Sequence, residues 1–138
     1  MKVILIGHGK TGVAFKEAVE MIFGKAENLI ALTFAPGEGL KDVCDKIITA
    51  SSGITSDQIL IVTDLYSGTP YNAAASLVLK GKAKDVIAGM SLPILLEIVT
   101  KMNSTSITDI VKGILQDSGT FTTALSAEMQ KQEEEDDF

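Results

Sequence analysis

Short apolar runs alternate with amphipathic stretches along this chain, a pattern typical of β-strands that alternate with α-helices. Continuous apolar runs predict four buried strands, at Val3–Ile6, Leu29–Phe34, Gln58–Thr63 and Asp85–Gly89. Apolar residues at helical spacing predict five helices, at Val13–Phe23, Leu40–Ala50, Pro70–Lys80, Pro93–Met102 and Ser106–Gln116. Strands and helices that alternate in this way form a parallel sheet with helices on its two faces.

We therefore expect an α/β fold, with an open, doubly wound sheet of four parallel strands in the order 2-1-3-4. The weak apolar alternation of Gly119–Leu125 predicts a further, C-terminal edge strand. The length of 138 residues suits one domain, which we expect at residues 1–126. Residues 127–138 hold six acidic side chains and one Lys, and we expect this acidic tail to be disordered.

Composition and charge narrow the range of partners. Aromatic residues make up only 5% of the chain, so we expect an aliphatic core, as in buried parallel sheets. The net charge is −6, and all 12 basic residues are Lys. A chain without Arg lacks the bidentate group that reads bases and clamps phosphates, which argues against nucleic acid as a partner.

Few side chains are suited to holding a metal or a cofactor. The single cysteine, Cys44, and the single histidine, His8, exclude a disulfide within the chain and any multi-Cys metal site. We therefore expect neither a metal nor a cofactor. The sequence contains no signal peptide and no run of the roughly 20 apolar residues that span a bilayer, so we expect a cytoplasmic protein.

The segment Gly7–Gly12 matches the pattern G-x-G-x-x-G between a strand and a helix. In dinucleotide-binding proteins, an acidic residue at the end of the second strand then holds the ribose. Here the second strand ends near Phe34 without an acidic residue, and His8 fills the position where a pyrophosphate would approach. A nucleotide-binding regulatory domain that uses Gly7–Gly12 stays open as an alternative.

His8 is the strongest candidate for chemistry. It follows the first strand, it has a glycine on each side, and a helix begins at Thr11 or Gly12. A helix N-terminus favours an anion, and a neutral imidazole nitrogen is a nucleophile at pH 7. A nucleophile beside a phosphate site predicts a phosphohistidine, with Gly9 in the phosphate-binding loop.

Asp64 follows the third strand directly, at the same edge of the predicted sheet as His8. A carboxylate on one ring nitrogen fixes the tautomer and leaves the other nitrogen free to react. The alternative interpretation is that Asp64 is a turn or cap residue. The same two interpretations, phosphate donor or turn residue, apply to Ser67, Thr69 and Asn72.

Four segments of the chain resemble one known family. They are LIGHG at the first strand, PGEGL after the second, VTDLYSGTPYNAA after the third and IAGMSLPILLEIV near the fourth. In this order they resemble the enzyme IIA component of the mannose-family sugar phosphotransferase system. The resemblance covers Met1 to Leu125.

This resemblance implies a phosphohistidine relay. The phosphocarrier protein HPr would phosphorylate Nε2 of His8, with the carboxylate of Asp64 on Nδ1, and the phosphoryl group would pass to a IIB component and on to a sugar. The membrane components IIC and IID would be indirect partners of a free-standing IIA subunit. Thr69 stands where the family usually has an active-site Ser, and Ser67 replaces a usual Gly. The family also implies a homodimer in which the C-terminal strand, here Gly119–Leu125, packs across the partner.

A second function is compatible with the same fold and the same histidine. In a phosphorylation sensor, the phosphorylated state of His8 would control a transcription regulator or another enzyme. A related assembly phosphorylates dihydroxyacetone, although the SGTPYN loop resembles the mannose type more closely. The sugar cannot be predicted, because in this relay it never contacts the IIA subunit.

Overall fold

The structure, a computed structural model, describes residues 1–136. Its strands are β1 (Lys2–His8), β2 (Leu29–Phe34), β3 (Ile59–Thr63) and β4 (Asp85–Ala88). Its α-helices are α1 (Thr11–Phe23), α2 (Leu40–Ala50), α3 (Thr69–Leu79), α4 (Leu92–Lys101), α5 (Ile107–Asp117) and α6 (Leu125–Asp136). Short 3₁₀ helices lie at Ser56–Gln58 and Ser118–Thr120. None of the helices in the described part of the chain combines the length and the apolar character needed to span a bilayer.

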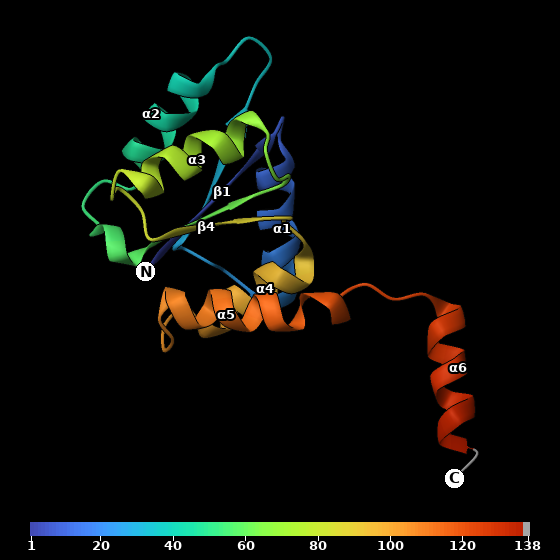
Figure 1. The fold of residues 1–138 in the computed structure, drawn as a ribbon. Helices are drawn as coiled ribbons and strands as arrows, with labels where there is room; N and C mark the ends of the chain where they lie inside the picture. The colour runs from blue at the N-terminus through green and yellow to red at the C-terminus, as the bar shows by residue number, and fades with distance from the viewer. Residues whose placement is uncertain (137–138) are drawn as a thin grey trace.

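The four strands are parallel and form one sheet in the order β2-β1-β3-β4, which confirms the predicted topology (Figure 1). Successive side chains of β1 point to opposite faces of the sheet. Val3 and Leu5 belong to the apolar cluster that includes α1, α4 and α5. Ile4 and Ile6 belong to the cluster that includes α2 and α3. Helices thus cover both faces, which explains why the strands are continuous apolar runs.

β1 extends two residues beyond the apolar run Val3–Ile6 that predicted it. Gly7 is paired with Thr33 of β2, and His8 is paired with Phe34. Backbone pairing with β2 therefore continues the strand where the side chains no longer indicate one. His8 is the last residue of a strand, so its backbone is held by the sheet.

The C-terminal region differs from the prediction. Gly119–Leu125 forms no strand in this structure, because Ser118–Thr120 continues α5 as a 3₁₀ turn and Phe121 packs on the apolar core. The sequence predicts disorder for residues 127–138, whereas Leu125–Asp136 form α6. Glu, Gln, Met and Lys all favour helix even where nothing is buried, and this propensity explains the difference. Residues 137–138 lie outside the described residues.

Helix α6 stands away from the body of the protein and contains no buried residue (Figure 1). We expect a chain that ends at Ala124 to keep the melting temperature of the full chain, because α6 buries no apolar surface. Thermal unfolding followed by circular dichroism measures this. A fall of several degrees would show that α6 packs on the body.

Candidate functional site

His8 and Asp64 meet at the carboxyl ends of two neighbouring strands. β1 and β3 are paired up to Ile6 and Thr63, so the residues that follow leave the sheet side by side. The backbone N–H of His8 donates a hydrogen bond of 2.9 Å to Oδ2 of Asp64. Nδ1 of the His8 ring lies 3.0 Å from the same oxygen. The structure therefore brings together the two residues to which the sequence analysis gave the main roles.

Asp64 is ionised at neutral pH in this environment. Burial of the carboxyl group, whose side chain is 18% exposed, raises the pKa of Asp64. The hydrogen bonds from the backbone N–H and the ring of His8 lower it and prevail, so that the pKa of Asp64 lies below its usual value. A carboxylate only accepts hydrogen bonds, so Nδ1 carries the proton that it donates to Oδ2. Nε2 is then the unprotonated nitrogen of the neutral ring.

The His8 ring is fixed on its Nδ1 side and open on its Nε2 side. Its side chain is 51% exposed, and the contact of Nδ1 is the one hydrogen bond of the ring within residues 1–136. The ring packs edge-to-face with Phe34, with the centroids 5.5 Å apart. Gly9 and Phe34 exchange two backbone hydrogen bonds of 2.8 and 3.2 Å, which hold Phe34 beside the ring.

The other predicted site residues lie directly after β1 or around the start of α3. Gly9 follows β1 with a φ of 61°, a left-handed conformation that favours glycine. Thr69 is the first residue of α3 and is half-buried, whereas Ser67 and Asn72 are exposed. In the described part of the chain, no side chain of these residues forms a hydrogen bond with the His8 ring or the Asp64 carboxylate. Their part in phosphate binding therefore stays a prediction.

Sequence analysis misses two neighbours of the His8 ring, Phe34 and Gly68. A Cβ atom added to Gly68 would lie 3.2 Å from Cε1 of the ring and 3.7 Å from Nε2. The ends of the two predicted strands could have indicated Phe34, because the structure pairs His8 and Phe34 at the ends of β1 and β2. No sequence signal indicated Gly68, since its position depends on the path of the loop after β3.

Two alternative ligands, a nucleotide and a metal ion, find little support in the structure. The backbone N–H groups of His8 and Gly9, which a pyrophosphate would use, already donate to Oδ2 of Asp64 and to the carbonyl oxygen of Phe34. The Asp64 carboxylate also lies against Gly7, where an added Cβ would be 2.8 Å from Cγ of Asp64. Residues 1–136 contain no group of three or more His, Cys, Asp or Glu side chains that could hold a metal ion.

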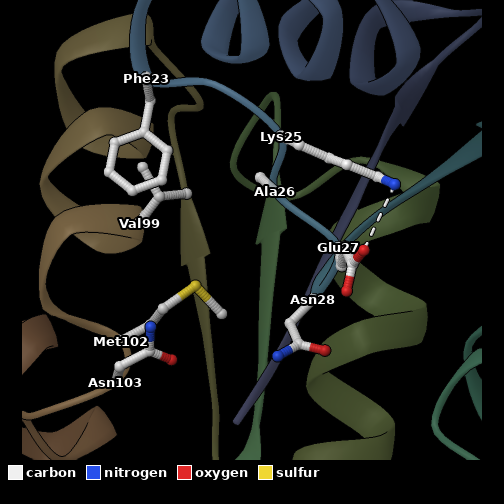
Figure 2. A pocket seen from close by; sticks show the side chains of 8 residues that line it. All are labelled: Phe23, Lys25, Ala26, Glu27, Asn28, Val99, Met102 and Asn103. Carbon is white, nitrogen blue, oxygen red and sulfur yellow. Dashed lines mark ion pairs between the residues drawn. The ribbon is translucent and has the colours of Figure 1, made fainter.

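A pocket of about 250 Å³, shown in Figure 2, lies at the amino ends of the strands, whereas His8 lies at the carboxyl end of β1. It is lined by the end of α1, the segment before β2 and the end of α4, through Phe23, Lys25, Ala26, Glu27, Asn28, Val99, Met102 and Asn103. Lys25 and Glu27 form an ion pair of 3.3 Å beside it. Because this pocket is at the amino ends of the strands, it takes no part in the site around His8 and Asp64.

The chain is similar to proteins of one kind over most of its length. The model of a family described as "PTS system fructose IIA component" matches residues 2–115. The sequence is 49% identical to the PTS system sorbose-specific EIIA component of Lacticaseibacillus casei over 100% of both chains. It is 38% identical to the PTS system fructose-specific EIIA component of Bacillus subtilis, over 83% of this chain and 79% of that one. Among solved structures, phosphotransferase system component EIIA from Streptococcus agalactiae matches with a TM-score of 0.83 at 26% identity, covering 91% of this chain and 98% of that one.

Proposed function

The chain belongs to the family of PTS IIA components, and on that basis we propose that it carries a phosphoryl group on His8. Members of this family are phosphotransferase components of the sugar phosphotransferase system, in which HPr and a IIB component are the partners. In the proposed relay, the phosphoryl group moves in the cytoplasm from HPr to His8 and from His8 to the IIB component.

One observation supports His8 as the phosphorylated residue: its Nδ1 lies 3.0 Å from Oδ2 of Asp64. An ionised Asp64 keeps the ring proton on Nδ1, so that the lone pair of Nε2 is available on the open side of the ring. An unprotonated, exposed ring nitrogen is what a nucleophile for phosphoryl transfer needs. His8 is also the single histidine of the chain.

In the proposed step, the lone pair of Nε2 attacks the phosphorus atom of the donor. A bond forms between Nε2 and phosphorus, the bond from phosphorus to the donor atom breaks, and the donor keeps that electron pair. The ring becomes positively charged while its proton stays on Nδ1. The carboxylate of Asp64, 3.0 Å away, stabilises this charge. Transfer to the IIB component repeats the exchange with His8 as the donor.

The surface beside His8 supports a protein as the exchange partner. Leu65 and Tyr66 follow Asp64 directly and are 57% and 71% exposed. The ring of Tyr66 lies 4.9 Å from that of Tyr71 in α3, between centroids. Exposed apolar and aromatic side chains next to the reactive nitrogen suit a protein–protein contact, which HPr and the IIB component would make in turn.

The names of two relatives indicate a sugar class. The proteins at 49% and 38% identity are named for sorbose and for fructose, which are both ketohexoses. We propose that the system served by this chain takes up a ketohexose. In the proposed relay the sugar contacts other components, so this proposal concerns the system and assigns no residue of this chain to sugar recognition.

Incubation of the full chain with phosphorylated HPr tests the proposed relay. We expect a single phosphoryl group, bound to Nε2 of His8, as detected by phosphorus and nitrogen NMR. A phosphoryl group on another residue, or on Nδ1 of His8, would contradict the proposal. Addition of a IIB component should then remove the group.

We further propose that the chain forms a homodimer with its C-terminal segment in the interface. β4 lies at the edge of the sheet, and edge strands pair readily with another chain. A chain that ends at Gly119 should sediment as a monomer, whereas one that ends at Ala124 should sediment like the full chain. A dimer that survives removal of residues 120–138 would exclude this segment from the interface.

A further inference from the structure

In the loop between β3 and α3, the residue with a left-handed backbone is Ser67 and not its neighbour Gly68. Ser67 has a φ of 68°, in the left-handed region that favours glycine. Gly68 has a φ of −92° and a ψ of 175°, which is extended backbone open to any residue. The backbone conformation therefore gives no reason for a glycine at position 68.

Helix capping gives no reason for this glycine either. Gly68 is the N-cap residue of α3. As a glycine, it has no side chain that could accept a hydrogen bond from the first turn of the helix. At the N-cap of α4, Ser91 accepts a hydrogen bond from a backbone N–H at 3.4 Å, and at that of α5, Ser106 does so at 3.2 Å. Serine is among the best N-cap residues and caps a helix better than glycine does. Stability alone would therefore favour serine at position 68.

The space beside the His8 ring does explain the glycine. A Cβ atom at position 68 would lie 3.2 Å from Cε1 of the ring, closer than ordinary van der Waals contact, and 3.7 Å from Nε2. Asp64 holds the ring from its Nδ1 side, at 3.0 Å. A side chain at position 68 would therefore push the ring away from Asp64 or fill the space next to Nε2.

We propose that Gly68 is a positioning residue for phosphoryl transfer. Its lack of a side chain keeps the imidazole in place against Asp64 and leaves room at Nε2 for the incoming phosphoryl group. This inference rests on the proposed function of His8. Gly68 acts through the position of the ring and takes no part in bond formation.

Three single substitutions in the full chain test this role: Gly68→Ala, Gly68→Ser and, as a control, Gly39→Ala. Gly39 is the N-cap residue of α2 and has the same extended backbone, with a φ of −118° and a ψ of −173°. A Cβ atom added to Gly39 would meet only Oδ2 of Asp42, at 4.0 Å. The control therefore reproduces the changes in capping and chain entropy without a methyl group near His8.

Both substitutions of Gly68 should lower the initial rate of phosphoryl uptake from HPr by about tenfold or more, because small misplacements of a reacting group are costly. Gly68→Ser should do so with a melting temperature at least equal to that of the wild type, since it gains an N-cap hydroxyl group. Gly39→Ala should take up phosphate at the wild-type rate. The slow uptake of the Gly68 variants would then not result from unfolding.

Nitrogen NMR of the unphosphorylated protein provides a second readout, which does not depend on transfer. The chemical shifts of Nδ1 and Nε2 of His8 report the hydrogen bond to Asp64, and they should change in both Gly68 variants but not in Gly39→Ala. Unchanged shifts together with wild-type uptake in Gly68→Ala would overturn the inference. If the wild type accepts no phosphoryl group while the shifts still change, the proposed function fails, whereas the effect of Gly68 on the position of the ring is confirmed.

Discussion

Replacement of His8 by alanine should abolish phosphoryl uptake from phosphorylated HPr. The chain contains no second histidine, so no other imidazole can replace the nucleophile. The fold should survive, because the side chain is 51% exposed and its removal uncovers little apolar surface. Transfer from radiolabelled HPr measures the loss, and thermal unfolding of the same sample measures the fold.

His8→Gln is the matched control for this substitution. In His8→Ala the carboxylate of Asp64 loses its hydrogen bond to the ring, which lowers stability. The glutamine amide keeps a polar group near Asp64, so the loss of stability should be smaller in His8→Gln. We expect both variants to remain unlabelled and to unfold at temperatures close to that of the wild type. Full labelling of His8→Ala would show that the phosphoryl group is carried elsewhere and would remove the phosphohistidine from the mechanism.

Replacement of Asp64 by asparagine should slow phosphoryl uptake by about 10- to 100-fold, the loss typical for a group that orients a reactive histidine. Asparagine removes the negative charge that keeps the proton on Nδ1 and that, in the proposed relay, stabilises the positive ring of phosphorylated His8. Initial rates at several HPr concentrations measure the change in kcat/KM. Asp45→Asn, in an exposed ion pair on α2, alters the net charge equally and should transfer at the wild-type rate. If Asp64→Asn transferred phosphate at the wild-type rate, Asp64 would be a turn residue without a role in transfer.

Asp64→Asn should also destabilise the protein in a manner that depends on pH. The pKa of Asp64 is lowered in the folded protein, so its carboxylate contributes stability above the unfolded-state pKa. That contribution is lost as the pH falls through the folded-state pKa. The difference in the free energy of unfolding between the wild type and Asp64→Asn should therefore be full at pH 7 and disappear once the pH falls below the folded-state pKa of Asp64. Urea unfolding at a series of pH values measures it, and a difference that is constant with pH would contradict this account.

The parallel sheet could be predicted because helices bury it on both faces. Every residue of β3, from Ile59 to Thr63, is buried, and such strands appear in the sequence as continuous apolar runs. Each run ends where the chain leaves the sheet, which is close to His8 for β1 and at Asp64 for β3. Because parallel strands have their carboxyl ends at one edge, the proximity of this pair also followed from the sequence.

The C-terminal region could not be predicted with the same success, because burial imposes no strong pattern there. The alternation in Gly119–Leu125 is weak, and local 3₁₀ geometry after α5 prevails over it. In Leu125–Asp136 the negative charge predicts disorder, whereas the residue types favour a helix. No residue of this segment is buried, so helix propensity determines its local structure. Where the core makes no contact, composition alone is a poor guide to local structure.

The sequence by itself determined the strand order, the two layers of helices and the edge of the sheet that holds His8 and Asp64. The tertiary structure alone decided which groups meet around the imidazole: Oδ2 of Asp64 at Nδ1, the ring of Phe34 in edge-to-face contact, and Gly68, without a side chain, beside Cε1 and Nε2. These contacts depend on strand register and on the backbone angles of the loop after β3, such as the φ of 68° at Ser67. Side-chain periodicity reports which face of an element is buried, but it contains no information about the path of a loop. For that reason the sequence indicated the pair of His8 and Asp64, and only the three-dimensional arrangement revealed the glycine beside the imidazole.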